Sequence, residues 1–415
     1  MSSKEEVSTN QHGLKVAFLC PDAFSVWRFY GGLLKRLKAL GCRVHIICAH
    51  GEEVALFLNE GFVHEPLMLN RFVNPLADIR TLLELYRLFR TERFDVVHSV
   101  TLKLNTYGAI AARTAGIRRF VGTVEGLGFS YIEAAGIGRR ILSRMMDALN
   151  SVAFRLSEKV WFVNDTDLQE LSERGVIRPG KGVYIKSHGI NTDDFSMDAL
   201  DPSKLAALRK EFGVERDTTL LLMVAARAVW SKGILEFVEA ARAVQLRRPK
   251  VKFLLVAPVD EGSPDTVDAA YVRSHQAPGF QWCETFRNDV TEIMGICDVF
   301  VLPSYYREGI PTVLLEAMAL GKPIITTDNV GCRDVVEDGV NGHMVPVKDA
   351  EALATAMARL VDDPAQRVEF GQAGREMALR EFNESIVLAR VLDELYGFDQ
   401  VARKESEYSA SQATP

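Results

Sequence analysis

Residues 14–48 read LKVAFLCPDAFSVWRFYGGLLKRLKALGCRVHIIC, and this stretch decides the fold class. Residues 14–20 form a short apolar run of the kind that makes a strand buried on both faces, and residues 43–48 form a second one. The apolar spacing between them predicts a helix from about 29 to 40, closed by Gly41. A buried strand, a helix and another buried strand indicate a parallel sheet covered by helices, the α/β class.

The same alternation continues along the chain and then restarts. It predicts strands at 94–98, 120–124, 160–163 and 183–186, with helices at 76–91, 105–115 and 166–174. The stretch that follows is rich in Asn, Asp, Thr and Ser, which predicts a linker at 191–202. The second series has strands at 220–226, 252–257, 298–302 and 324–327, with helices at 232–248, 313–320 and 349–360.

The two series predict two Rossmann-like domains, at 14–190 and 203–380, and a chain of 415 residues is long enough for two cores. Open parallel sheets bind ligands in the crevice at the carboxyl ends of their strands. A helix at 381–397 is expected to cross back to the first domain, and 398–415 is expected to be a polar tail.

Composition excludes several classes of protein. Hydrophobic residues at 47% and charged residues at 25% are typical of a globular chain. The net charge of −6 argues against a nucleic-acid partner, since phosphate binding needs a basic surface. The six cysteines have no metal-like spacing and indicate reduced thiols, and no apolar run approaches the length of a membrane span. The first dozen residues lack the apolar core of a signal peptide, so a cytoplasmic protein is expected.

The first candidate site lies within residues 302–323, LPSYYREGIPTVLLEAMALGKP. A strand is expected to end at its start, and Pro311 stands where a helix should begin. The first amides of a helix have no internal partner, so with the helix dipole they favour an anion such as a diphosphate. Gly309 lets a ligand approach the backbone. Glu308 and Glu316 would then bracket one small-molecule site.

A second candidate is the segment ARAVWSKG at 226–233, where two cations flank a loop between a strand and a helix. Arg227 can bind a phosphate through its fork, and Lys232 acts as a point charge. Together they would neutralise a departing diphosphate. Alternatives remain for both candidates: Arg227 and Lys232 could be ordinary surface cations, Glu316 a helix residue favoured by the dipole, and Glu308 a solvated loop residue.

These two segments together resemble the retaining glycosyltransferases of the GT-B fold, family four. The E-x7-E signature of that family matches Glu308 and Glu316, and its R-x4-K pair matches Arg227 and Lys232. Four further stretches are similar to the branch that adds N-acetylhexosamines to lipid-diphosphate-linked sugars, the bacillosamine-type N-acetylgalactosaminyltransferases among them. They are VVHSVTLKLNTYG at 96–108, EGLGF at 125–129, APVDEG at 257–262 and TDNVGCR at 327–333.

The resemblance implies two domains facing across a cleft, with the donor on the second. Glu316 is expected to bind the ribose of a nucleotide-sugar, with UDP as the expected nucleotide, and Glu308 to face the sugar. The backbone of Gly309, Ile310, Pro311 and Thr312 is expected to contact the sugar and diphosphate. The family transfers a hexose or N-acetylhexosamine with retention and without an essential metal or cofactor, which implies that Arg227 and Lys232 do the work of a divalent ion. The implied acceptor is a glycan linked to a lipid diphosphate, in cell-surface polysaccharide synthesis.

Four residues are candidates for the acceptor side. Many members of the family carry a Gly-Gly loop after the first strand, but residues 21–30 here read PDAFSVWRFY, so Arg28 could take over part of its phosphate contact. Glu125 stands where relatives often have Thr; it could bond an acceptor hydroxyl or only cap a turn. His98 could contact the acceptor or be a structural hydrogen-bonder, and Lys103 could bind its diphosphate or be a surface lysine.

Residues 138–159 predict an amphipathic helix with arginines beside its apolar face. Such a helix can lie on an anionic membrane surface, which would make the protein peripheral on the inner face of the membrane, or it can pack on a core.

Two rival functions stay open. A nucleotide-sugar epimerase can share the two-domain architecture and would convert the donor without an acceptor. A non-catalytic sugar-nucleotide-binding protein is the other, and the presence of Arg227, Lys232, Glu308 and Glu316 together argues against it.

Overall fold

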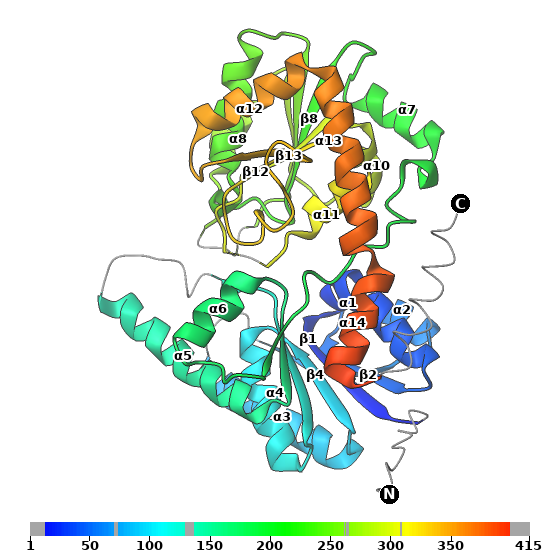
Figure 1. The fold of residues 1–415 in the computed structure, drawn as a ribbon, viewed down its shortest axis with the longest axis vertical. Helices are drawn as coiled ribbons and strands as arrows, with labels where there is room; N and C mark the ends of the chain where they lie inside the picture. Colours follow the sequence, from blue (N-terminus) through cyan, green and yellow to red (C-terminus); the bar gives the residue numbers. More distant parts are fainter. Residues whose placement is uncertain are drawn as a thin grey trace, which may run out of the picture. The chain divides into compact units, whose positions relative to one another are not determined.

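The computed structural model describes residues 13–69, 74–128, 137–260, 262, 265–307 and 309–398, apart from the side chains of 137–142. The chain divides into two compact units, which Figure 1 shows as ribbons. The first unit consists of Met1–His188 and Val387–Pro415, and the second of Gly189–Ile386. The predictions for Glu308 and for most of the tail fall outside the described residues.

The first unit is built on a seven-stranded parallel sheet in the order β3-β2-β1-β4-β5-β6-β7. Its strands are β1 (Lys15–Asp22), β2 (Arg43–Ala49), β3 (Val63–Pro66), β4 (Val96–Val100), β5 (Arg119–Val124), β6 (Lys159–Phe162) and β7 (Gly182–Tyr184). This is the doubly wound order, in which the direction of winding reverses between β1 and β4. Strand β4 is buried along its whole length, and β1 and β5 along most of theirs, which explains their apolar runs.

Helices cover both faces of this sheet, as Figure 1 shows. They are α1 (Ala23–Ala39), α2 (Val54–Asn59), α3 (Pro75–Glu92), α4 (Leu102–Ala115), α5 (Ile137–Leu156), α6 (Asp165–Glu173) and most of α14 (Glu384–Tyr396). Residues of α1, α2 and α14 share one apolar core with the sheet, and residues of α3 to α6 share the other. Successive strand residues, such as Phe18 and Leu19, enter opposite cores.

The second unit repeats the plan with a six-stranded parallel sheet in the order β10-β9-β8-β11-β12-β13. Its strands are β8 (Thr219–Val224), β9 (Val251–Val256), β10 (Phe280–Cys283), β11 (Val299–Leu302), β12 (Ile324–Thr327) and β13 (Gly342–Val345). Its helices are α7 (Pro202–Glu211), α8 (Ile234–Gln245), α9 (Ala269–Ser274), α10 (Val290–Ile296), α11 (Thr312–Ala319), α12 (Ala350–Asp362) and α13 (Pro364–Met377). The winding here reverses between β8 and β11, so the predicted α/β class with two Rossmann-like parallel sheets is confirmed.

Several predicted elements differ in detail for physical reasons. Helix α1 begins at Ala23 rather than near 29, because the Asp22 carboxylate accepts a hydrogen bond from the Ser25 amide (2.8 Å) and caps the first turn. Gly31 and Gly32 therefore lie inside this helix. Strands β3, β10 and β13 were not predicted, since each is an edge strand of only four residues.

Helix α5 ends at Leu156, before the predicted end at 159. Its apolar residues divide between two faces. Ala153 and Phe154 are buried in the core, whereas Met145, Leu149 and Val152 are 52%, 43% and 43% exposed. None of the helices described in the structure is both long and apolar enough to cross a bilayer.

Candidate active site

The loops that follow β8 and β11 lie side by side, at the point in the second unit where the winding reverses. The carbonyl of Ser231, in the β8 loop, accepts hydrogen bonds from the amides of Tyr305 (2.9 Å) and Tyr306 (3.0 Å), in the β11 loop. Nδ2 of Asn329 donates to the Tyr306 carbonyl at 2.8 Å. Open parallel sheets bind ligands at such a reversal, so these two loops are the first place to expect a site.

Gly233 sets how closely the two loops approach. Its φ is +80°, and a Cβ built on it would stand 2.1 Å from the carbonyl oxygen of Pro303. A residue other than glycine would force the loops apart as well as strain the backbone. The glycine therefore fixes the position of the short 3₁₀ turn Trp230–Lys232 against the β11 loop.

The two predicted cations lie on the β8 loop. Nζ of Lys232 is 5.8 Å from the centre of the Tyr306 ring, so this lysine is directed toward the β11 loop. The Arg227 side chain is 52% exposed, and one of its guanidinium nitrogens is 3.5 Å from Oδ2 of Asp260. Asp260 itself is largely buried, which gives it a fixed position from which to orient the arginine. Both cations can reach an anion bound at this edge of the sheet.

Helix α11 begins where the β11 loop ends. Its N-cap is Pro311, which provides no side-chain oxygen to its first turn, and Gly309 and Ile310 before it are buried. Thr312 is the first helical residue, and Glu316 on the same helix is 2% exposed. The structure thus brings Lys232, the 309–312 backbone and Glu316 to one edge of one sheet. Glu308 lies outside the described residues.

Three residues have roles here that the sequence did not reveal. Asp260 orients Arg227, Asp265 accepts a hydrogen bond from the Ser231 amide (3.0 Å), and Asn329 holds the β11 loop. Two of them lie in the stretches APVDEG and TDNVGCR, whose similarity to the family was noted without assigning a role. Their contacts depend on strand order, which spacing alone does not give.

On the first unit, the turn after β1 offers no open phosphate site. Both oxygens of the Asp22 carboxylate are engaged by Ser25, through its amide at 2.8 Å and its hydroxyl at 3.0 Å. A carboxylate thus occupies the helix terminus that a Gly-Gly loop would leave to an anion. Arg28 is an exposed residue of α1, in the turn that follows.

His98 is fully buried in β4, and both ring nitrogens are engaged. Nδ1 is 2.6 Å from the Tyr396 hydroxyl, and Nε2 is 2.6 Å from Oγ1 of Thr123. Burial lowers its pKa to about 3, with a smaller contribution from His188, so the ring is neutral. This placement does not support the predicted contact with an acceptor; His98 instead joins the sheet to α14.

Lys103 lies in the first turn of α4, where its ammonium is 2.8 Å from Oδ1 of Asp78 on α3. Burial acts to raise the pKa of Asp78, but the bond from Lys103 and further hydrogen bonds outweigh it, and the net shift is downward. An anion that bound Lys103 would therefore have to share it with this carboxylate.

Glu125 stands directly after β5, at the carboxyl edge of the sheet, in a network of polar groups. The Tyr30 hydroxyl is 2.9 Å from Oε1 of Glu125 and 2.9 Å from Nε2 of His188. Burial raises the pKa of Glu125 to about 7; the bond from Tyr30 opposes this and the charge of Asp22 adds to it. Burial lowers the pKa of His188 to about 4. The network can therefore pass between a neutral and an ionised Glu125 near neutral pH, while the imidazole stays uncharged.

Comparison with known proteins identifies the chain. Residues 26–194 match the family model described as Glycosyltransferase Family 4, and residues 207–377 match Glycosyl transferases group 1. The chain is a GT-B glycosyltransferase. It is 28% identical over 380 residues to an N,N'-diacetylbacillosaminyl-diphospho-undecaprenol alpha-1,3-N-acetylgalactosaminyltransferase of Campylobacter jejuni, covering 91% of this chain and 97% of that one.

Other relatives agree with this family. The glycosyltransferase is 26% identical over 298 residues to a UDP-Gal:alpha-D-GlcNAc-diphosphoundecaprenol alpha-1,3-galactosyltransferase of Escherichia coli, covering 71% of this chain and 73% of that one. Its fold matches that of Anabaena HepE, crystallised with UDP and glucose, with a TM-score of 0.76 at 19% identity over 93% of this chain and 100% of that one. The two sequence relatives named here are transferases, and the comparisons give no evidence for the epimerase alternative.

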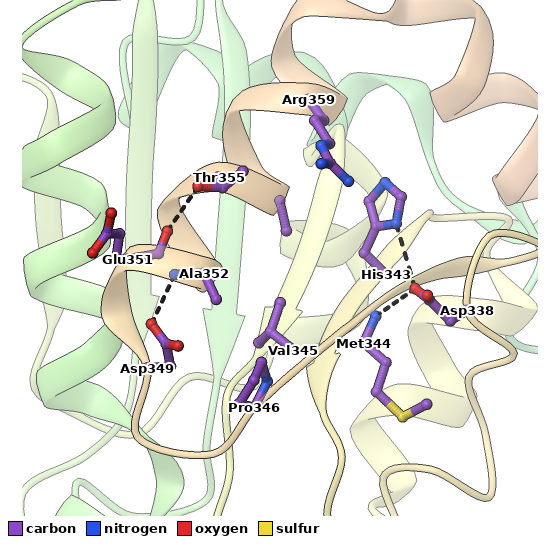
Figure 2. Close-up of a pocket in the computed structure, with 11 residues that line it drawn as sticks. Asp338, His343, Met344, Val345, Pro346, Asp349, Glu351, Ala352, Thr355 and Arg359 are labelled. Carbon is purple, nitrogen blue, oxygen red and sulfur yellow. Dashed lines mark hydrogen bonds and ion pairs between the residues drawn. The ribbon is translucent and has the colours of Figure 1, made fainter.

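Figure 2 shows a pocket of about 440 Å³ between β13 and the start of α12 in the second unit of the glycosyltransferase. There the Asp338 carboxylate accepts a hydrogen bond from the Met344 amide (2.9 Å) and lies 3.5 Å from Nδ1 of His343. None of the predicted site residues lines this pocket. Within the described residues, no group of three or more His, Cys, Asp or Glu side chains could hold a metal ion.

The pKa of Glu125 predicts a pH dependence of stability. Between its ordinary value of 4.5 and about 7, the folded protein keeps a proton that the unfolded chain releases. The contribution of Glu125 to the free energy of unfolding is thus fully present below 4.5 and is lost as the pH rises through 7. The lowered pKa of His188 has the opposite effect: below its ordinary pKa of 6.5, the contribution of His188 to the free energy of unfolding rises with pH. In the wild-type protein this rise offsets part of the loss from Glu125.

We therefore expect Glu125→Gln, which cannot ionise, to gain stability relative to the wild-type protein between about pH 5 and about pH 8. Denaturant unfolding of both proteins at both pH values measures this difference. Glu173→Gln, at an exposed position on α6, is the matched control, and its free energy of unfolding should change between the two pH values as that of the wild-type protein does. If the free energy of unfolding of Glu125→Gln also changes as that of the wild-type protein does, the raised pKa of Glu125 is wrong.

Proposed function

We propose that this glycosyltransferase transfers a hexose or N-acetylhexosamine, with retention of configuration and without a metal ion, from a UDP-sugar to a glycan carried on a lipid diphosphate. The observation that carries the proposal is the pair of hydrogen bonds to the Ser231 carbonyl. They hold a loop with two cations against a loop that leads into a helix N-terminus, at the reversal point of a doubly wound sheet.

The donor binds to the second unit in this proposal. The diphosphate accepts hydrogen bonds from Arg227 and Lys232 and faces the backbone of 309–312, and the ribose hydroxyls bond to Glu316. Because Glu316 is 2% exposed, such a bond would be shielded from water and correspondingly strong. Glu308 faces the sugar. The solved structures of Anabaena HepE with UDP and with UDP-glucose, which share this fold, support a UDP-sugar donor.

The reaction breaks the bond between the anomeric carbon and the diphosphate, and forms a bond from that carbon to an acceptor hydroxyl oxygen. The electron pair of the broken bond stays on UDP, and the hydroxyl proton is released. Negative charge therefore grows on the diphosphate as the bond breaks. Arg227 and Lys232 stabilise that charge, and Asp260 keeps the arginine oriented for it.

The acceptor binds to the first unit. Glu125 and Tyr30 form a hydrogen-bonding pair at the carboxyl edge of the sheet, suited to a sugar hydroxyl. The cations Lys103 and Arg28 are the proposed contacts of a diphosphate, which would share Lys103 with Asp78. Two of the relatives named above act on diphosphate-linked undecaprenol sugars, which supports a lipid-linked acceptor.

Such an acceptor resides in a membrane, and α5 offers a surface for it. Met145, Leu149 and Val152 follow one another at helical spacing and are all exposed, beside the exposed Arg144. An exposed apolar stripe with a flanking cation is the surface of a helix that lies in an anionic lipid interface.

Replacing Glu316 with Gln should weaken UDP binding about tenfold or more, because a hydrogen bond to a charged group contributes roughly 1.5–3 kcal/mol. Gln keeps the buried volume, so the fold should persist. Calorimetric titration with UDP measures the dissociation constant, and Glu337→Gln, an exposed residue of the same unit, is the control. Equal affinity of Glu316→Gln and the wild-type protein would remove the ribose assignment.

Arg227→Gln and Lys232→Gln should each lower kcat by about a hundredfold or more, because each removes stabilisation of the departing diphosphate. Lys210→Gln, an exposed lysine on α7, should leave it unchanged. The assay follows release of UDP in the presence of a lipid-diphosphate-linked acceptor sugar. Near-normal turnover in both cation variants, or loss of wild-type turnover on adding a chelator, would overturn this role.

Leu149→Gln should reduce sedimentation of the protein with vesicles that contain phosphatidylglycerol, because it removes an exposed apolar side chain from the proposed interface. It should also slow transfer to a lipid-linked acceptor more than transfer to a short soluble analogue. Leu246→Gln, at a position 81% exposed in the second unit, is the control. A wild-type protein that ignores these vesicles at low salt would rule out membrane contact through α5.

A further inference from the structure

A second pocket of the first unit, of about 500 Å³, lies at the amino ends of β5 and β6, the edge of the sheet opposite to Glu125. Its lining residues come from the last turns of α4 and α5, the starts of two strands and the residue before β7. They are Arg113, Arg118, Arg119, Arg155, Leu156, Ser157, Glu158 and Lys181, and we call them the basic pocket.

The basic pocket holds five cations and one carboxylate. Arg119 is held in place, by the Tyr396 carbonyl at 2.8 Å and by Glu158 at 3.4 Å, and Lys181 donates to the Ser157 carbonyl. The other three arginines, at 113, 118 and 155, are exposed. Within the part of the chain that the structure describes, the side chain of none of these three has an ion pair or a hydrogen bond. Five like charges are therefore gathered with a single carboxylate, Glu158, as their counter-ion within the pocket.

Helix dipoles do not account for this charge. Arg113 and Arg155 lie in the last turns of α4 and α5, where a cation complements the roughly half negative charge of each helix end. Two helix ends and Glu158 together supply about two negative charges against five positive ones. About three positive charges remain for something else to neutralise.

Two further cations, Arg178 and Lys159, act on Lys181 from outside the lining of the pocket. Burial lowers its pKa most, and the cations Arg178 and Lys159 lower it further, while Glu158 opposes them. A bound anion would relieve the repulsion among these groups.

We propose that the basic pocket binds a phosphate-bearing anion with two or more negative charges. Guanidinium forks match phosphate oxygens in pairs, and Arg119 is already oriented by its contacts with the protein. The ligand is a soluble phosphate compound or the head group of an anionic lipid, since both present the same oxygens. This site is separate from the proposed donor site, whose residues all belong to the second unit.

The test uses the full chain carrying Arg227→Gln and Lys232→Gln, so that the proposed donor site does not bind the probe. Inorganic diphosphate is added at low ionic strength, and acetylation of Lys181 is followed by mass spectrometry with the exposed Lys210 as reference. Diphosphate should protect Lys181 and not Lys210, and protection should fade at high salt.

Adding Arg113→Gln and Arg118→Gln should raise the diphosphate concentration needed for half-protection by about tenfold or more. Arg90→Gln is the matched control, because Arg90 is likewise an exposed arginine in the last turn of a helix but lies outside the pocket. Equal melting temperatures of the two variants exclude a difference in folding. Protection that survives Arg113→Gln and Arg118→Gln would overturn the proposal.

Vesicles distinguish the two sources of phosphate. Protection of Lys181 by phosphatidylglycerol vesicles, and not by phosphatidylcholine vesicles or free diphosphate, would assign the pocket to a lipid head group. Protection by diphosphate alone would assign it to a soluble phosphate compound. Protection by none of these probes would show that the pocket binds no such anion.

Discussion

The candidate donor site depends on the close approach of the backbone of Gly233 to that of Pro303 in the second unit. Because there is no Cβ at Gly233, the β8 loop can lie against the β11 loop, and the Ser231 carbonyl can then bond two amides of that loop at once. Lys232 precedes the glycine by one residue, and α11 begins nine residues after the proline. A single backbone constraint thus sets the distance between the cationic loop and the start of a helix whose first turn has no side-chain cap.

How much the sequence could predict depended on whether a feature was local. Strands such as β1 and β4 are buried on both faces, so their apolar composition was enough to predict them. The spacing of the motifs was enough to predict Lys232 and Glu316 as site residues. The edge strand β3 carries few apolar residues and was missed. The bonds of Tyr30 to Glu125 and His188 join residues 95 and 158 positions apart. Nothing short of the strand order brings those three together, and the same holds for His98, whose two partners fix it in the core.

The two edges of the first sheet are electrostatically unlike. At the carboxyl edge, polar groups are buried and satisfy one another, so that the histidines are neutral and Glu125 is poised near neutral pH. At the amino edge, arginines are gathered in a pocket with one carboxylate among them. A parallel sheet with its helices directs the negative helix ends to its amino edge, and the cations here exceed what those ends require.

The C-terminal part of α14 bears on how this protein can fold during synthesis. Residues 387–398, Val391, Leu392 and Tyr396 among them, complete a core whose other members precede residue 189. Tyr396 is the partner of the buried His98. One face of the first sheet is therefore covered only in part, by α1 and α2, until α14 has left the ribosome. The second unit, which is continuous in sequence, can close its core earlier, although its residues are translated later than most of the first. The first unit is thus translated earlier than the second but completes its core later. Part of its apolar surface stays exposed until α14 has been synthesised.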